Sequence, residues 1–100
     1  MKIGLTNSEI AAIKTCAATF PEISDVIVYG SRALGNHKVG SDVDITLKGS
    51  ISLDTVSRVK YKLEEETNLP YFFDISDYNS LRNSDLIEHI NKYGISLFEK

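Results

Sequence analysis

The amino-acid sequence predicts a single α/β (α+β) domain, with a small mixed β-sheet flanked by helices. Three observations support this prediction. The chain of 100 residues, with 42% hydrophobic and 25% charged content, is typical of one compact domain and leaves no room for a second. Segments with helical apolar spacing alternate with short β-branched or aromatic runs. Turn-forming residues separate these segments, and no linker or internal repeat interrupts them, so the domain is expected to span residues 1–100.

The individual elements follow from residue periodicity and from the residues that punctuate it. Apolar residues at helical spacing, preceded by a capping residue and followed by proline, mark helices. Continuous β-branched runs mark strands buried on both faces, and polar-apolar alternation marks a strand with two different faces. This periodicity does not determine the order of the strands. In chain order we expect a helix from Thr6 or Asn7 to before Pro21, a strand at 25–29, a helical turn at 31–34, a strand at 42–48, a helix from 53 to before 68–70, a strand at 71–75, a helix at 84–93 and a last short strand at 95–98.

The charge and hydropathy of the chain argue against several classes of function. The net charge is -3, the isoelectric point is about 5.3 and basic residues are scattered, so general nucleic-acid binding is not expected. The N-terminus lacks the pattern of a signal peptide, and no apolar stretch is long enough to cross a bilayer. We therefore expect a cytoplasmic protein without membrane contact. The lone Cys16 lies in an apolar helical run and is expected in the core.

Two short motifs carry the candidate chemistry. Gly30 ends a strand and Ser31 opens a helical turn, which places free backbone N–H groups and a hydroxyl where a phosphate could bind. Asp42 and Asp44, two positions apart on the next strand, project from one face. Carboxylates placed together among apolar neighbours repel each other unless a cation offsets their charge. Because Mg²⁺ prefers carboxylate and phosphate oxygens, the two motifs together predict a site for a magnesium-bound nucleotide.

A third carboxylate, Asp74, interrupts an apolar run and has no basic or capping partner nearby in the sequence. If its strand pairs beside the strand of Asp42 and Asp44, three carboxylates could hold two metal ions. Asp74 would then orient or deprotonate an acceptor hydroxyl. Asp77, three residues further on, is an alternative polar residue that could cap the following turn. The predicted metal ligands and catalytic residues are therefore Asp42, Asp44 and Asp74.

The spacing of these motifs resembles the signature of the minimal nucleotidyltransferase (MNT) family of the DNA polymerase beta-like superfamily. The matching residues are Gly30-Ser31-Arg32 and, after residues 33–40, Ser41-Asp42-Val43-Asp44. The order of helices and strands matches the family across nearly the whole chain, which implies the nucleotidyltransferase fold. The resemblance implies nucleotide contacts at Gly30, Ser31, Arg32 and Ser41, binding of Mg²⁺ or Mn²⁺ at Asp42, Asp44 and Asp74, and a basic residue in the preceding turn at Lys38.

The same resemblance implies an enzyme, a nucleotidyltransferase that moves AMP from ATP to an acceptor hydroxyl and releases pyrophosphate. Similar proteins pair with a helical HEPN-family protein, and some of them act as antitoxins by adding AMP to a tyrosine of the toxin, so a homo- or hetero-oligomer is expected. Without an extra domain to hold the acceptor, another polypeptide is expected to complete that site. Two alternatives stay open: adenylylation of a small molecule such as an aminoglycoside, and a non-catalytic or weakly active module that neutralises a helical partner by occlusion.

The motif residues also have purely structural interpretations. Alone, Gly30 and Ser31 would be a strand end followed by a helix cap. Asp42 and Asp44 could be solvent-facing residues of an edge strand. Arg32 could be a solvated surface residue. The coupling of the two motifs in one signature favours the functional interpretation for the glycine-serine turn and the two carboxylates.

Histidines and aromatic residues are not expected to take part in the chemistry. His37 and His89 lack metal-ligand spacing with each other or with the cysteine, so both are expected at the surface. Five aromatic residues lie in or beside expected core elements and are expected to pack there and not to stack on a nucleobase: Tyr61, Tyr71, Phe72, Phe73 and Tyr78.

Overall fold

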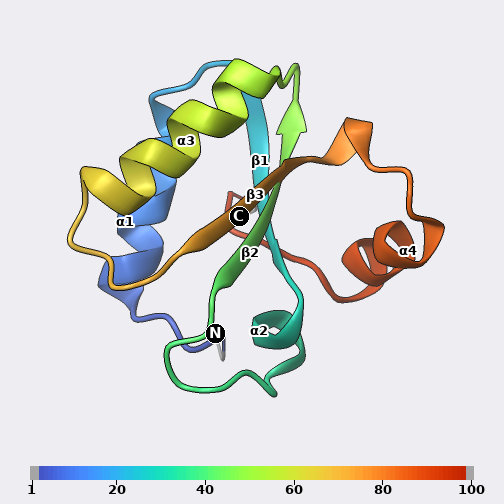
Figure 1. Ribbon diagram of the computed structural model, residues 1–100, viewed down its shortest axis with the longest axis horizontal. Helices are drawn as coiled ribbons and strands as arrows, with labels where there is room; N and C mark the ends of the chain where they lie inside the picture. The colour runs from blue at the N-terminus through green and yellow to red at the C-terminus, as the bar shows by residue number, and fades with distance from the viewer. Residues whose placement is uncertain (1–2, 99–100) are drawn as a thin grey trace.

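The computed structural model describes residues 3–98 and shows a mixed α+β domain (Figure 1). Every element expected from the periodicity is present, although several boundaries differ from the prediction. The elements are α1 (Asn7–Ala18), β1 (Ile23–Tyr29), α2 (Ser31–Leu34), β2 (Val43–Gly49), α3 (Leu53–Glu65), β3 (Phe73–Asp77), the 3₁₀ helix η1 (Tyr78–Ser80), α4 (Ser84–Tyr93) and β4 (Ile95–Ser96).

The four strands form one sheet with the order β3-β2-β1-β4. The strand β1 is antiparallel to both of its neighbours, β2 and β4, and β2 is parallel to β3. The connection from β2 to β3 runs through α3, because parallel neighbours need a crossover and a helix supplies it. Since β1 and β2 each have a strand on both sides, the two motifs of the sequence lie at the centre of the sheet and not at its edge. The edge-strand interpretation of Asp42 and Asp44 is therefore wrong.

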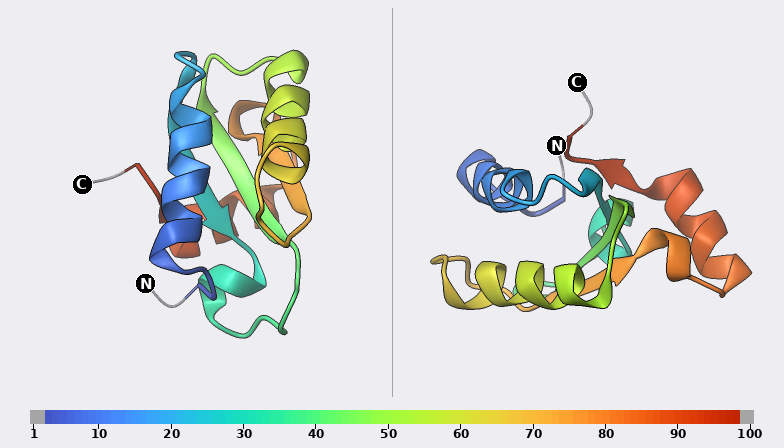
Figure 2. Two further views of the ribbon diagram at one scale, coloured as in Figure 1. Left: turned by 90° about the vertical axis from the view of Figure 1, so that its left-hand side faces the viewer. Right: turned by 90° about the horizontal axis from the view of Figure 1, so that it is seen from above.

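The two faces of the sheet are covered by different helices. Figure 2 shows α1 and α3 side by side on one face and α4 on the other. The main core lies under α1 and α3 and contains alternate strand residues such as Val28, Ile45 and Phe73, together with Cys16, as predicted. A smaller cluster under α4 contains Ile27, Tyr29 and Ile90. The face under α4 thus carries the alternate residues of β2 and β3, which include Asp44 and Asp74.

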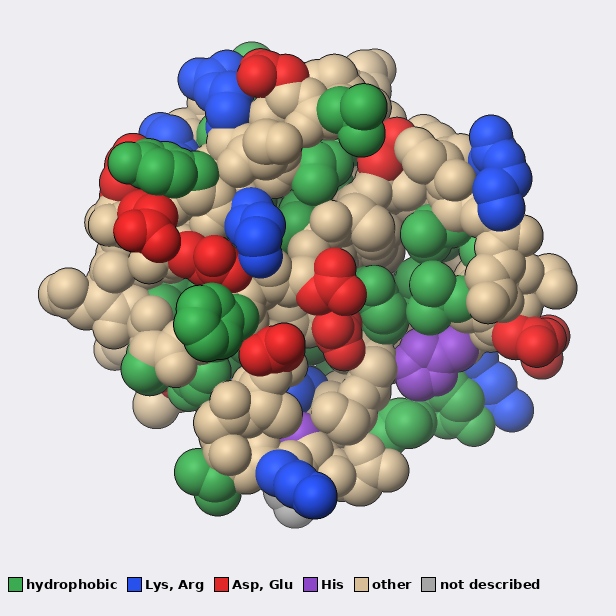
Figure 3. All heavy atoms as spheres, viewed as in Figure 1, with side chains coloured by type: hydrophobic (Ala, Val, Ile, Leu, Met, Phe, Trp, Pro, Cys, Tyr) green, Lys and Arg blue, Asp and Glu red, His purple; other side chains and the backbone are tan. Residues whose placement is uncertain are grey.

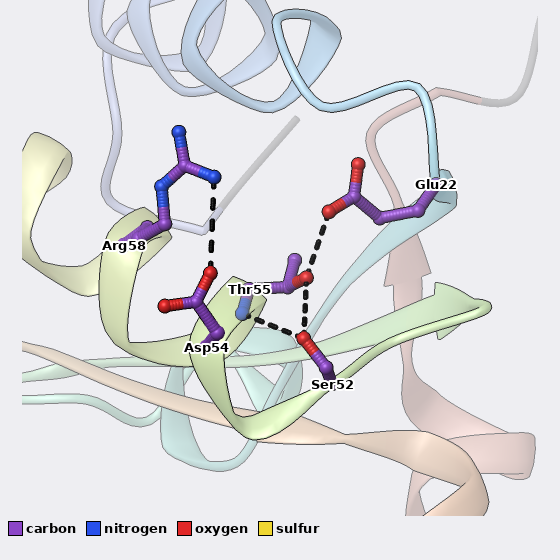
Figure 4. Close-up of polar contacts among 5 residues, drawn as sticks. All are labelled: Glu22, Ser52, Asp54, Thr55 and Arg58. Carbon is purple, nitrogen blue, oxygen red and sulfur yellow. Dashed lines mark hydrogen bonds and ion pairs between the residues drawn. The ribbon is translucent and has the colours of Figure 1, made fainter.

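The start of α3 is joined to the start of β1 by polar contacts (Figure 4). Ser52 caps α3 by accepting a hydrogen bond from the backbone N of Thr55 at 3.1 Å. The Thr55 hydroxyl donates to Glu22 Oε2 at 2.7 Å. An exposed ion pair between Arg58 and Asp54, at 3.8 Å, adds little stability because solvent screens it. The partly buried bond to Glu22 is therefore the contact that fixes the beginning of this crossover helix against the sheet.

The strand β3 begins at Phe73, two residues later than the sequence predicts. Phe72 is 72% exposed, whereas Phe73 is 1% exposed and enters the core, so inward alternation starts only at Phe73. The prediction that Phe72 packs in the core is wrong, and so is that for Tyr61, which is 59% exposed. Tyr71 does pack: its ring is nearly perpendicular to that of Phe73, and the two ring centroids are 6.5 Å apart. None of the helices within residues 3–98 is long and apolar enough to span a bilayer.

Candidate functional site

The strand register brings two of the predicted carboxylates together. In the parallel pair β2–β3, Asp44 lies opposite Asp74, and in the antiparallel pair β1–β2 it lies opposite Tyr29. The neighbours Val43 and Phe73 point into the core under α1 and α3, so Asp44 and Asp74 point to the other face. The two aspartates therefore lie side by side on adjacent strands, close to the end of β1 where the glycine-serine turn begins. Figure 3 shows acidic side chains near the centre of the molecule in this view.

Asp44 is the most buried of the three carboxylates and is affected by the other two. Asp42 precedes the first residue of β2 and is exposed, as is Asp74, whereas Asp44 is partly buried. Burial raises the pKa of the Asp44 carboxyl, and the nearby charges of Asp74 and Asp42 raise it further. The three carboxylates thus lie within electrostatic reach of one another, as the sequence predicts. The charge of Arg32 acts on the pKa of Asp44 in the opposite direction, but within residues 3–98 no ion pair engages any of the three.

The donor set fits a hard divalent cation that completes its coordination with other oxygens. Within residues 3–98, no three Asp, Glu, His or Cys side chains converge enough to hold a metal ion by themselves. Mg²⁺ commonly binds through one or two carboxylates together with phosphate oxygens and water. Asp42, Asp44 and Asp74 therefore suit a cation that arrives together with a triphosphate.

The turn after β1 depends on the absence of a side chain at Gly30. Its backbone angles are φ 77° and ψ -152°, a conformation that is essentially restricted to glycine. A Cβ at this position would overlap Asp44 Oδ2. The backbone of Gly30 thus lies directly against the Asp44 carboxylate, and the two halves of the signature are in contact. This close approach could not be predicted from the sequence, which shows only that the two residues are spaced as in the family signature.

Ser31 is the first residue of the short helix α2 and is partly buried. No side chain caps the start of this helix at Gly30. The first backbone N–H groups of a helix have no partner inside the helix, so they are directed toward whatever lies at its N-terminal end. Here that end adjoins Asp44 through Gly30. The predicted phosphate-binding turn and the predicted metal ligands therefore belong to one site.

Arg32 lies inside the protein, so its interpretation as a solvated surface residue is wrong. The side chain is 2% exposed. Its guanidinium donates to the carbonyl oxygens of Ile3 at 3.0 Å, Ser41 at 2.7 Å and Asp42 at 3.4 Å. It also lies 4.8 Å from the ring centre of Tyr71. These contacts favour a role in which Arg32 holds the loop before β2 in place, and they do not favour direct contact with a phosphate.

Ser41 contributes to the site through its backbone. Its carbonyl accepts the shortest of the Arg32 hydrogen bonds, and its hydroxyl oxygen is buried and has no hydrogen-bond partner among the described residues. A buried hydroxyl is poorly placed to meet a nucleotide, so its predicted nucleotide contact remains a prediction that this geometry does not favour. Lys38 is exposed in the same loop. Both residues thus lie where the family resemblance places them, in the loop that leads to Asp42.

We expect Arg32→Lys to destabilise the protein by about 2–3 kcal/mol, because one ammonium cannot replace three hydrogen bonds made by a planar guanidinium and leaves buried carbonyls unpaired. Urea unfolding followed by circular dichroism measures the change. Arg58→Lys is the matched control, since Arg58 is exposed and its ion pair with Asp54 contributes little, so a change below ~0.5 kcal/mol is expected. Equal effects of the two substitutions would contradict the assigned role of Arg32.

The structure also brings to the glycine-serine turn a residue that the sequence does not indicate as functional. His89 of α4 accepts a hydrogen bond from the backbone N–H of Gly30 at 2.9 Å. It is partly buried, so the expectation of a simple surface residue is wrong for His89. The two residues are 59 positions apart, and no motif links them, so only the packing of α4 on β1 reveals the contact. His37 is also partly buried, with its Nδ1 atom buried and unpartnered within residues 3–98.

Comparisons with known proteins identify chains that are similar to this one in sequence and in fold. A curated protein of Haemophilus influenzae named "Probable protein adenylyltransferase MntA" is 28% identical over 100 residues, which cover 99% of this chain and 87% of the relative. A solved structure described as a toxin-antitoxin with AMP-PNP superposes with a TM-score of 0.73 and 21% identity, over 96% of this chain and 75% of that one. A second solved structure, of a tri-AMPylated Shewanella oneidensis HEPN toxin in complex with MNT antitoxin, superposes with a TM-score of 0.70 and 16% identity. The match covers 100% of this chain and 74% of that one.

The two solved structures establish the fold, since their sequence identity to this chain is low. The family is established by a match along the sequence itself. The model of the family described as "Polymerase beta, Nucleotidyltransferase" matches residues 11–100, a range that contains the glycine-serine turn and all three carboxylates of the site. The chain therefore belongs to the polymerase beta nucleotidyltransferase family.

Proposed function

We propose that this protein transfers AMP from ATP to a hydroxyl of a helical HEPN-family partner, and that a divalent cation, Mg²⁺ or Mn²⁺, is required. The family makes nucleotidyl transfer the reaction class. The relative named as a protein adenylyltransferase favours AMP as the transferred group and a protein as the acceptor. Two solved structures with the same fold, one containing AMP-PNP and one an AMPylated HEPN toxin, favour ATP as donor and a HEPN protein as partner.

One observation carries the proposal. Asp44 lies opposite Asp74 in the sheet, and the backbone of Gly30 lies against the Asp44 carboxylate. A glycine-serine turn that can contact phosphates and carboxylates that can bind a cation therefore meet at one point. Neither group alone would distinguish this protein from an ordinary α/β domain, because capped turns and surface carboxylates are common.

The residues of the site have distinct proposed roles. Asp42 and Asp44 hold the cation together with phosphate oxygens, and Asp74 is the third acidic residue. Ser31 contacts the β- and γ-phosphates through its hydroxyl and backbone N–H, while Gly30 permits the close approach of the turn to Asp44. The cation, when bound, neutralises the charge that builds up on the phosphates. Positioning and charge neutralisation supply most of the rate in this kind of transfer.

The transfer itself is a displacement at the α-phosphorus. The acceptor hydroxyl oxygen forms a bond to the α-phosphorus, and the bond from this phosphorus to the oxygen bridging to the β-phosphate breaks. Pyrophosphate leaves with the electron pair of the broken bond. Asp74 accepts the proton of the acceptor hydroxyl, because it is exposed and can be reached by a macromolecular acceptor, whereas Asp44 is partly buried.

Labelled ATP tests this proposal directly. The protein and its purified partner are incubated with Mg²⁺ and either α-³²P-ATP or γ-³²P-ATP. Label on the partner from the α-position alone is expected, because AMP transfer releases the γ-phosphate and phosphorylation would retain it. Mass spectrometry of the labelled partner then locates the modified hydroxyl. Label from the γ-position, or no label from either nucleotide, would contradict the proposal.

The double substitution Asp42→Asn and Asp44→Asn separates transfer from neutralisation by occlusion. We expect loss of labelling and loss of protection of cells against the partner. Asp77→Asn is the matched control, because Asp77 lies on the same strand as Asp74 but caps η1, accepting from the backbone N of Asn79 at 3.1 Å and the Ser80 hydroxyl at 2.6 Å. Asparagine also caps helices well, so labelling should persist. Protection that survives the double substitution would instead favour occlusion.

A further inference from the structure

A histidine from the face opposite the main core contacts the phosphate-binding turn. The backbone N–H of Gly30 donates to His89 Nε2 at 2.9 Å. The donor belongs to the peptide group that joins Tyr29 to Gly30, one peptide before the group that carries the N–H of Ser31, the residue that opens α2. A hydrogen bond to this peptide restrains its plane, and from this plane the backbone continues through the φ and ψ angles of Gly30, 77° and -152°, to the N–H of Ser31.

The imidazole ring is itself held from several sides. It meets the ring of Tyr29 edge-on, with centroids 6.3 Å apart and planes at 74°, and the ring of Tyr93 at 5.5 Å. The following residue, Ile90, is 3% exposed and anchors α4 against Ile27 and Tyr29 of β1. His89 therefore connects a packed helix to the turn, and its rotamer is restrained in a way that an exposed side chain would not be.

The contact requires one particular tautomer of the histidine. A ring nitrogen that accepts a hydrogen bond carries no proton, so the neutral imidazole must carry its proton on Nδ1. The side chain also lines a surface pocket of about 350 Å³ together with Glu88 and Lys92, so one edge of the ring remains open to solvent. The arrangement differs from simple packing, because an apolar residue could fill the same space but could not accept from Gly30.

We propose that His89 is a positioning residue for nucleotide binding, and that it acts by accepting the Gly30 N–H and so orienting the turn that contacts the phosphates. This inference rests on the proposed function. The bond leaves the Gly30 N–H engaged, so phosphate contacts are made by Ser31 and the groups that follow it. His89 therefore affects the affinity for the nucleotide and has no role in proton transfer from the acceptor hydroxyl.

Two substitutions distinguish positioning from packing. His89→Leu removes the acceptor and keeps a side chain of similar bulk, whereas His89→Gln offers an amide oxygen near the place of Nε2. We expect His89→Leu to raise KM for ATP by about five- to tenfold, the loss expected for one hydrogen bond, with kcat changed less than about twofold. His89→Gln should restore most of the affinity. Glu88→Leu, a change to a neighbouring exposed residue of the same pocket, should leave KM unchanged.

A spectroscopic measurement tests the bond without relying on catalysis. In uniformly ¹⁵N-labelled protein, we expect a scalar coupling across the hydrogen bond between Gly30 N and His89 Nε2, and ¹⁵N shifts of the His89 ring that report the Nδ1–H tautomer. Exchange of the Gly30 amide with deuterium should be slow in the wild type and in His89→Gln, and faster in His89→Leu. An Nε2–H tautomer, or equal exchange in all three proteins, would overturn the contact.

Failure of this inference can be told apart from failure of the proposed function. Calorimetry with AMP-PNP and Mg²⁺ measures nucleotide affinity without an acceptor, so it applies even if the wild type labels no partner. If the wild type binds AMP-PNP but transfers no AMP, the proposed function is overturned. The role of His89 is then decided by comparing the AMP-PNP affinity of the wild type with that of the His89 variants. Equal affinity of the wild type and His89→Leu, or equal weakening in His89→Leu and His89→Gln with the same fall in Tm, would overturn the positioning role.

Discussion

Replacing Asp44 with asparagine should strongly reduce AMP transfer and at the same time make the metal-free protein more stable. Transfer is expected to fall on the order of 10²–10³-fold, because a ligand of the cation that neutralises the phosphates is lost. The stability should rise because burial and two nearby carboxylates raise the pKa of Asp44, so its charged form is disfavoured in the folded protein. Since Asp44 is partly exposed, the increase in Tm is expected to be only ~2–4 °C. Label transfer and calorimetry measure the two effects.

The pH dependence of this gain has a definite sign. A raised pKa means that the folded wild type binds more protons than the unfolded chain, so its stability falls as pH rises from the ordinary value of 3.8 through the folded pKa. Below pH 3.8 the wild type and Asp44→Asn should therefore melt alike, and above the folded pKa the variant should be more stable. A variant that is less stable at neutral pH without added metal would contradict the assigned repulsion.

The second large effect is expected for Gly30→Ala. The backbone conformation of Gly30 is essentially restricted to glycine, so the substitution should cost about 1–3 kcal/mol of unfolding free energy. The new methyl group would also displace the Asp44 carboxylate, which it would otherwise overlap. Both halves of the site are disturbed together, so transfer should fall on the order of 10²-fold or more. Urea unfolding and label transfer measure these two losses.

Gly35→Ala is the matched control for this substitution. Gly35 also has a positive φ, 78°, but a Cβ there would meet nothing within 4 Å. The change should therefore cost about 1 kcal/mol from backbone strain alone and leave transfer within a fewfold range. If Gly35→Ala lowered transfer as much as Gly30→Ala, the contact between Gly30 and Asp44 would not be the cause.

Much of the fold could be predicted because strong local patterns agree with tertiary packing. The helix at 84–93 has the observed limits, since Asn83 caps it and apolar residues recur at helical spacing. The strand at 25–29 is observed as part of β1, with a buried end, because its β-branched run suits a centre covered on both faces. The prediction for Phe72 is wrong for a physical reason. Two adjacent aromatic residues in a strand cannot both face the core, and the sequence does not show which one does.

The contacts of Arg32 and His89 lie beyond sequence-based prediction for a related reason. Both side chains carry groups suited to catalysis or to the surface, and their types alone do not distinguish these roles. Arg32 is buried because three backbone carbonyls from two distant segments converge on it. His89 meets Gly30 because α4 packs across β1. Each contact depends on how segments far apart in the chain are placed, which local periodicity does not encode.

Motif spacing and hydrophobic periodicity are local properties, so the amino-acid sequence is enough to predict the family, the element types and the candidates Gly30, Ser31, Asp42, Asp44 and Asp74. The folded chain adds three features that the sequence does not contain: β3 lies parallel beside β2, Asp74 therefore lies next to Asp44, and Gly30 contacts this carboxylate. Strand order and register are set by long-range packing of one whole face against α1 and α3, so no short segment of the chain contains them.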